Sequence, residues 1–149
     1  MKPTDKTDRS QTDALTFEFD LPHAPKKVWR ALTDPELLTQ WLLPVTGFSL
    51  EPGAAFTFNT QPQPGWDGAV NCKLLESREL EKLSYAWAVG GGLGLNTVVT
   101  FTLTPTPAGT RLVLVQSGFK PEQKQNFGGA RYGWNLMGGK LIELLGRIS

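Results

Sequence analysis

Cysteine and histidine are nearly absent from this 149-residue sequence, which contains one of each, Cys72 and His23. One cysteine cannot form an intrachain disulfide or a cysteine-based zinc site, and one histidine cannot form a histidine-cluster metal site. A hydrolase triad would depend on His23, and no G-x-S-x-G signature accompanies it. We therefore expect no metal site. We interpret Cys72 as a small core residue and His23 as an exposed residue at a strand-to-helix junction.

Long basic runs and long apolar runs are also missing. The formal net charge is +1, and two basic residues adjoin only in the pair Lys26–Lys27. Nucleic-acid binders usually carry a basic stripe, so we expect no nucleic-acid partner. No segment approaches the roughly 20 apolar residues of a membrane-spanning helix, so we expect no membrane span.

The first thirteen residues are polar and lack the apolar segment of a signal peptide. We expect a disordered leader over residues 1–13 and a single domain over residues 14–149. The absence of disulfides fits a reducing compartment, which predicts a cytoplasmic protein.

The spacing of apolar residues changes twice along the chain. Residues 15–19 alternate between apolar and polar, and two short helical segments follow, each with a proline near its start, at Pro25 and Pro35. After Pro44 the alternation returns for about 70 residues, which is typical of an antiparallel sheet with one buried face. From Trp134 to Ile148 the spacing is helical again. This order predicts the α+β class, with the last helix covering the apolar face of a curved sheet.

Four glycines fall within residues 90–94, which raises the question of a phosphate-binding loop. The G-x-G-x-x-G spacing is not met, and no Lys-Ser or Lys-Thr follows as in a P-loop. The run also joins two strand-like segments, whereas phosphate sites lie where a strand leads into a helix. We interpret it as a hairpin loop and expect no cofactor. Whether this loop gates a cavity stays open.

Seven large side chains share the buried side of the predicted strands and of the last helix. They are Phe56, Phe58, Tyr85, Trp87 and Phe101 on the strands, and Trp134 and Met137 on the helix. Such side chains fill the core in most domains, but large rings on a curved sheet pack imperfectly against one helix. The helix also carries Gly133, Gly138 and Gly139, each of which costs about 0.5–1 kcal/mol relative to alanine. Close approach to a neighbour or a ligand would explain them, and a frayed or kinked helix is the alternative. We favour a cavity between sheet and helix.

Three segments of the chain carry a family resemblance. They are APKKVWRALTDPELLTQWL, the pattern GT-R-L-LVQSGF across residues 109–119, and YGWNLMGGKLIELL. They resemble the activator-of-Hsp90-ATPase-homologue-like (AHSA1-like) branch of the START/Bet v 1-like SRPBCC superfamily, and the resemblance covers residues 14–148. It implies a helix-grip fold, in which a curved antiparallel sheet wraps a long C-terminal helix with a deep apolar cavity between them. Members bind lipids, sterols, polyketides or other apolar ligands, and some are cyclases or hydrolases.

The residues and the resemblance together leave three functional hypotheses. The leading one is a carrier or sensor that holds a small apolar ligand, lipid-like or aromatic, without catalysis. The ligand-binding residues would be Phe56, Phe58, Tyr85, Trp87, Phe101, Gln116, Trp134 and Met137, with the Tyr85 hydroxyl, the indole nitrogens and Gln116 as orienting polar groups. The first alternative is a cyclase or hydrolase in the same cavity. Members often carry a histidine before the final GF, where this sequence has Gln116 and Ser117; this departure disfavours catalysis. The second alternative is a stress-related module that interacts with an Hsp90-type chaperone. The ligand and the oligomeric state stay open.

Overall fold

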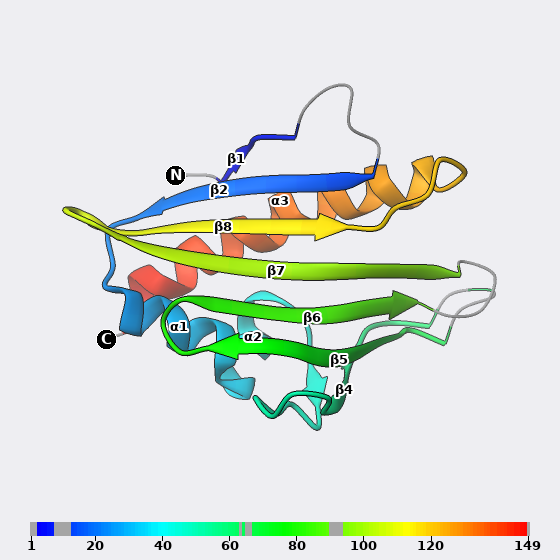
Figure 1. Ribbon diagram of the computed structural model, residues 1–149, viewed down its shortest axis with the longest axis horizontal. Coiled ribbons are helices and arrows are strands. Elements are labelled where there is room, and N and C mark those ends of the chain that lie inside the picture. Colours follow the sequence, from blue (N-terminus) through cyan, green and yellow to red (C-terminus); the bar gives the residue numbers. More distant parts are fainter. Residues whose placement is uncertain (1–2, 8–12, 63, 65–66, 90–93, 149) are drawn as a thin grey trace.

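The computed structural model describes residues 3–7, 13–62, 64, 67–89 and 94–148, which form a curved sheet with helices on one face (Figure 1). The strands are β1 (Thr4–Asp5), β2 (Ala14–Leu21), β3 (Val45–Thr46), β4 (Ala55–Asn59), β5 (Ala69–Arg78), β6 (Lys82–Val89), β7 (Leu95–Thr106) and β8 (Gly109–Ser117). The helices are α1 (Pro25–Thr33), α2 (Pro35–Trp41) and α3 (Lys124–Arg147). The order of the strands across the antiparallel sheet is β1-β2-β8-β7-β6-β5-β4-β3. The α+β helix-grip prediction is confirmed.

The two short helices begin where the sequence predicted. Pro25 and Pro35 occupy first-turn positions, where the missing backbone N–H has no helical partner to lose. Asp34 lies between the helices, and its Oδ1 accepts a hydrogen bond from the backbone N–H of Glu36 at 3.0 Å. This cap starts α2 directly after α1 ends. Each helix buries its apolar side chains.

The alternation in the strands determines which side chains face the helices. In β6, Leu83, Tyr85, Trp87 and Val89 are all buried. The register pairs Trp87 with Thr97 on β7, and Val99 on β7 with Gln116 on β8. Three neighbouring strands therefore bring an indole, a hydroxyl and an amide to the same region of the concave face.

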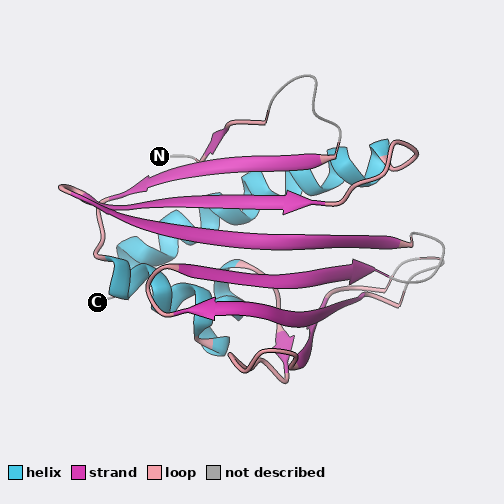
Figure 2. Ribbon diagram, viewed as in Figure 1, coloured by secondary structure: helices cyan, strands magenta, loops and turns pink. Residues whose placement is uncertain are grey.

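The long helix α3 lies along the face of the sheet that also carries α1 and α2 (Figure 2). Its buried residues recur at helical spacing and are Trp134, Gly138, Leu141, Leu144 and Leu145. The sequence stripe from Trp134 onward is therefore confirmed as the side that packs on the sheet. No helix in the described part of the chain is long and apolar enough to cross a membrane.

The N-terminal segment differs from the disordered leader that the sequence predicted for residues 1–13. Thr4–Asp5 forms strand β1, which pairs with β2, while residues 1–2 and 8–12 lie outside the described residues. Asp5 also forms an ion pair with Arg131 on α3. Pro3 is buried over α3, where a Cβ added to Gly138 would lie 2.8 Å from Pro3 Cγ and 3.0 Å from the ring of Phe19. The polar composition of the segment did not reveal this, because its order comes from contacts with β2 and α3, which are distant in the sequence.

Candidate ligand-binding site

A cavity of about 380 Å³ lies between the ends of β6 to β8 and the first half of α3. Its lining consists of Trp87, Val89, Leu95, Gln116, Gln125, Asn126, Gly129, Ala130, Gly133, Trp134 and Met137. Gln125 and Gly129 are exposed and therefore mark its mouth, whereas Gln116 and Trp134 are buried at its inner end. A volume of this size is within the range of small-molecule sites.

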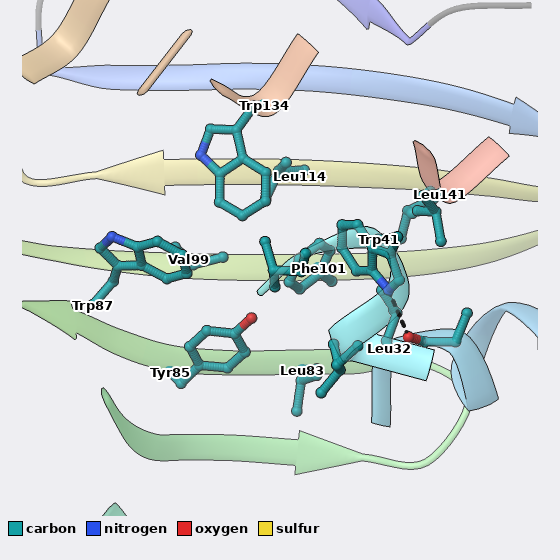
Figure 3. Packing of buried hydrophobic residues seen from close by; sticks show 14 of the residues in the cluster. Leu32, Trp41, Leu83, Tyr85, Trp87, Val99, Phe101, Leu114, Trp134 and Leu141 are labelled. Atoms are coloured by element: carbon teal, nitrogen blue, oxygen red, sulfur yellow. Dashed lines mark hydrogen bonds between the residues drawn. The ribbon is translucent and has the colours of Figure 1, made fainter. Parts of the chain in front are cut away.

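The structure divides the eight predicted site residues into two groups. Trp87, Gln116, Trp134 and Met137 line the cavity. The other four are Phe56, Phe58, Tyr85 and Phe101, which are 0–3% exposed and are not part of its lining. Figure 3 shows Phe101 beside Trp41, and Tyr85 between Trp87 and Leu83. The alternation along the strands places the six predicted strand residues on the concave face. The position of each residue along its strand then decides whether it reaches the cavity.

The four packed rings form a continuous aromatic cluster. The ring centroids of Phe56 and Tyr85 lie 5.2 Å apart, and those of Tyr85 and Phe101 lie 6.2 Å apart. Phe58 lies 5.5 Å from Trp87, which therefore joins the cluster to the cavity. These separations are typical of favourable aromatic contacts, so the cluster supports the cavity wall from behind.

Two indole rings form the apolar inner end of the cavity. The centroids of Trp87 and Trp134 lie 5.6 Å apart with an interplanar angle of 51°. Trp87 keeps 8% of its surface exposed, Val89 7% and Leu95 6%, more than the fully packed residues deeper in the core. The three apolar side chains that line the cavity from the sheet are therefore buried but not completely covered.

A buried hydrogen-bonded chain connects the polar groups at the inner end. The indole Nε1 of Trp134 donates to Gln116 Oε1 at 2.7 Å. Gln116 Nε2 donates to Thr97 Oγ1 at 2.9 Å, and Thr97 Oγ1 donates to the carbonyl oxygen of Trp87 at 2.9 Å. Gln116 is 1% exposed and Thr97 4% exposed, so the chain is shielded from solvent. It fixes the indole of Trp134 and reaches Trp87 at its backbone carbonyl.

Glycines on α3 shape the side of the cavity that this helix forms. A Cβ added to Gly129 would meet nothing within 4 Å, and one added to Gly133 would meet only Met137 Cε at 3.7 Å. Gly133 therefore adjoins open space, whereas Gly138 is in close contact with Pro3 and Phe19, and Gly139 has nothing within 4 Å. The three glycines that the sequence grouped together have different surroundings, and Gly133 is the one that borders the cavity.

The described lining has no side chain that titrates. Cys72 lies elsewhere in the core, where burial raises the pKa of its thiol to about 12. Burial, with a smaller contribution from Cys72, raises the pKa of Tyr85 well above its usual value. Both side chains therefore stay protonated at neutral pH.

His23 lies outside the cavity, at the junction between β2 and α1. It is half-buried, and its Nδ1 lies 3.2 Å from Lys27 Nζ. Burial, together with the charge of Lys27, lowers its pKa. Within the described ranges, no three His, Cys, Asp or Glu side chains cluster in a way that could hold a metal ion.

Sequence reasoning missed seven lining or linking residues: Val89, Leu95, Thr97, Gln125, Asn126, Gly129 and Ala130. Thr97 had a usable signal, because it has the same parity as Val99 and Phe101 and so had to be buried. Val89 and Leu95 flank the glycine run, of which residues 90–93 lie outside the described residues. Gly94 is described, and its carbonyl accepts from Gln123 Nε2 at 3.3 Å. The proposed gating by this loop therefore stays untested.

Sequence and structure comparisons agree on the family. The family model described as "Activator of Hsp90 ATPase homolog 1-like protein" matches residues 22–146. The chain belongs to this family. The match runs from the residue after β2 to the penultimate residue of α3, so every residue of the cavity lies within the AHSA1-like region. The resemblance stated from the sequence is confirmed.

Solved structures share the AHSA1-like fold over nearly the whole chain. Protein MLL2253 from Mesorhizobium loti is 39% identical with a TM-score of 0.84, covering 91% of this chain and 98% of that one. Protein CV1439 from Chromobacterium violaceum is 25% identical with a TM-score of 0.76, covering 91% and 98%. Protein Ms6760 from Mycobacterium smegmatis is 20% identical with a TM-score of 0.80, covering 99% of each chain. None of the curated proteins is significantly similar to this chain.

Proposed function

We propose that this chain holds a small apolar ligand, aromatic or lipid-like, in the cavity between β6–β8 and α3, as a carrier or sensor without catalysis. The observation that carries the proposal is an uncharged cavity of about 380 Å³ with two indoles at its inner end. Each Å² of apolar ligand surface buried there would contribute about 25 cal/mol to binding. The AHSA1-like fold, whose wider superfamily commonly binds ligands, supports the same function.

Two glycines of α3 lie in the lining and leave room beside the cavity. Glycine at positions 129 and 133 destabilises a helix by about 0.5–1 kcal/mol per residue relative to alanine. A Cβ fits at both positions without a close contact, so packing does not require glycine at either. A ligand that contacts the helix backbone would explain these two residues. Gly128, Gly139 and Gly146 on the same helix have equally open surroundings outside the lining, so the glycines alone do not carry the proposal.

The uncharged lining favours binding over chemistry. A cyclase or hydrolase would use a general acid or base within reach of its substrate, and none of the described lining residues can serve as one at neutral pH. Cys72 and Tyr85 are held protonated by burial and lie outside the lining. The cavity is therefore better suited to holding a molecule than to transforming it.

A chaperone-interaction module would need a broad exposed apolar patch. Among the described residues the large exposed hydrophobics are Leu50, Leu75, Tyr132 and Leu136, of which Tyr132 and Leu136 lie one turn apart on α3. A pair of side chains is smaller than the contiguous patches that mark protein interfaces. A chaperone partner and a cytoplasmic location stay predictions.

Replacing Trp87 with alanine is expected to weaken binding of the neutral fluorescent probe N-phenyl-1-naphthylamine by about tenfold. The substitution removes an indole from the inner end of the cavity, and roughly 50 Å² of lost apolar contact corresponds to that factor. The enhancement of probe fluorescence is titrated with wild type and variant. The matched control is Tyr85→Phe, outside the lining, which should bind as wild type does. Unchanged affinity in Trp87→Ala would remove this residue from the site.

A further inference from the structure

The side-chain amide of Gln116 has a fixed orientation. The indole N–H of Trp134 can only donate, so the Gln116 atom 2.7 Å away must be the oxygen. Thr97 Oγ1 uses its hydrogen to reach the carbonyl of Trp87, so it can only accept from Gln116, and the atom 2.9 Å away must be the nitrogen. Two partners with opposite requirements therefore determine both ends of the amide.

This orientation leaves one N–H of Gln116 without a partner. A primary amide nitrogen has two N–H groups, and among the described residues Nε2 donates only to Thr97. Gln116 is 1% exposed and lines the cavity, so bulk solvent does not reach the remaining donor freely. In proteins, a buried N–H almost always has an acceptor, whereas a carbonyl oxygen often keeps one lone pair unused. The unpaired N–H of Gln116 is therefore the group that a ligand would be expected to satisfy.

Among the described residues, the rest of the inner end offers a ligand no other free side-chain hydrogen-bond donor. Trp134 Nε1 and Thr97 Oγ1 are engaged in the same chain, and the carbonyl of Trp87 already accepts from Thr97. Gln125 is exposed and Asn126 half-buried at the mouth, where water competes for their amides. The free N–H of Gln116 is therefore the polar feature that can discriminate between ligands.

The absence of charged side chains in the described lining determines which hydrogen-bond acceptors a ligand can place there. The lining contains no Lys, Arg or His within the described residues, so a carboxylate or phosphate at the inner end would lose its hydration without a counter-charge. A neutral carbonyl has a much smaller desolvation penalty and accepts from an amide N–H with ordinary geometry.

From these contacts we infer that the ligand is an apolar molecule with a neutral carbonyl, such as a ketone, ester or amide, which accepts a hydrogen bond from the second N–H of Gln116. The inference rests on the proposed function, because it requires a ligand in this cavity. It makes Gln116 the residue that determines specificity, while Trp87 and Trp134 provide apolar contact.

The test compares three naphthalenes of similar size by equilibrium dialysis against the full-length protein at pH 7.5. The ketone 2-acetylnaphthalene is expected to bind about tenfold more tightly than 2-ethylnaphthalene, which lacks the carbonyl. The hydrocarbon is the more apolar of the two, so burial alone would give the reverse order. The anion 2-naphthoate is expected to bind at least tenfold more weakly than the ketone.

Gln116→Met tests the role of the amide directly. The ratio of ketone to hydrocarbon affinity should fall from about ten to about one, because the variant keeps the length of the side chain and loses the N–H. The control is Ser117→Ala, the next residue on β8, which faces the other side of the sheet and should keep the wild-type ratio. A ratio of ten in Gln116→Met would overturn the inference.

The wild-type measurements separate failure of the inference from failure of the proposed function. Equal binding of the ketone and the hydrocarbon would overturn the role of Gln116 and leave an apolar site standing. No binding of any naphthalene would overturn the proposed function and the inference with it. Neither result depends on how well the Gln116 variant folds.

Discussion

Replacing Trp41 with alanine is expected to lower the free energy of unfolding by about 3–5 kcal/mol. Trp41 is 1% exposed, and its ring meets that of Phe101 edge to face at a centroid distance of 6.3 Å. Its Nε1 donates to the carbonyl oxygen of Ala31 at 2.8 Å, which joins α2 to α1 (Figure 3). The substitution would therefore remove a buried ring and a buried hydrogen bond together. Urea denaturation followed by circular dichroism measures the loss.

Trp41→Phe is the matched control for this prediction. Phenylalanine retains an aromatic ring beside Phe101 and loses the indole N–H, so we expect a loss of about 1–2 kcal/mol. A free energy of unfolding for Trp41→Ala within about 1 kcal/mol of the wild-type value would contradict the prediction. The contact of α2 with the sheet would then not stabilise the fold as the structure indicates.

Replacing Gly133 with leucine is expected to reduce binding of N-phenyl-1-naphthylamine by about 100-fold or more, which corresponds to about 2.7 kcal/mol. The Cβ at this position meets only Met137 Cε at 3.7 Å, so the new side chain would extend into the cavity. Leucine is also a better helix former than glycine, so the free energy of unfolding should stay the same or rise. The loss of binding would then come from occupied space and not from unfolding.

Gly139→Leu separates these two effects. Gly139 is on the same helix but outside the cavity lining, with nothing within 4 Å of its added Cβ. The substitution makes the same change in helix propensity, and probe affinity should remain at the wild-type value. Equal binding by Gly133→Leu and wild type would show that the probe lies elsewhere.

Periodicity was sufficient to predict the fold because burial repeats at every second residue of a strand and at every third or fourth of a helix. The alternation in β6 identified Leu83, Tyr85, Trp87 and Val89 as buried, and all four are. The stripe on α3 was visible for the same reason. Strand β1 was not predicted, because its order depends on tertiary contacts of Pro3 and Asp5 that a polar segment does not reveal.

The candidate site was predictable only in part. Parity selects a face of the sheet, so Phe56 and Phe101 seemed equivalent to Trp87, although they pack in the core and Trp87 reaches the cavity. The orientation of the Gln116 amide needed the positions of Thr97 and Trp134, which come from different elements. Distances between elements are set by packing, and the spacing of residues along one strand contains no information on them.

Native mass spectrometry of the protein purified from the cells that produce it tests the central claim most directly. We predict a stoichiometric adduct that is present under native conditions, is lost on denaturation and extracts into organic solvent as a neutral apolar molecule. Gly133→Leu purified in the same way should lack the adduct. A wild-type native mass equal to the denatured mass would contradict the carrier function, as would an adduct that Gly133→Leu retains.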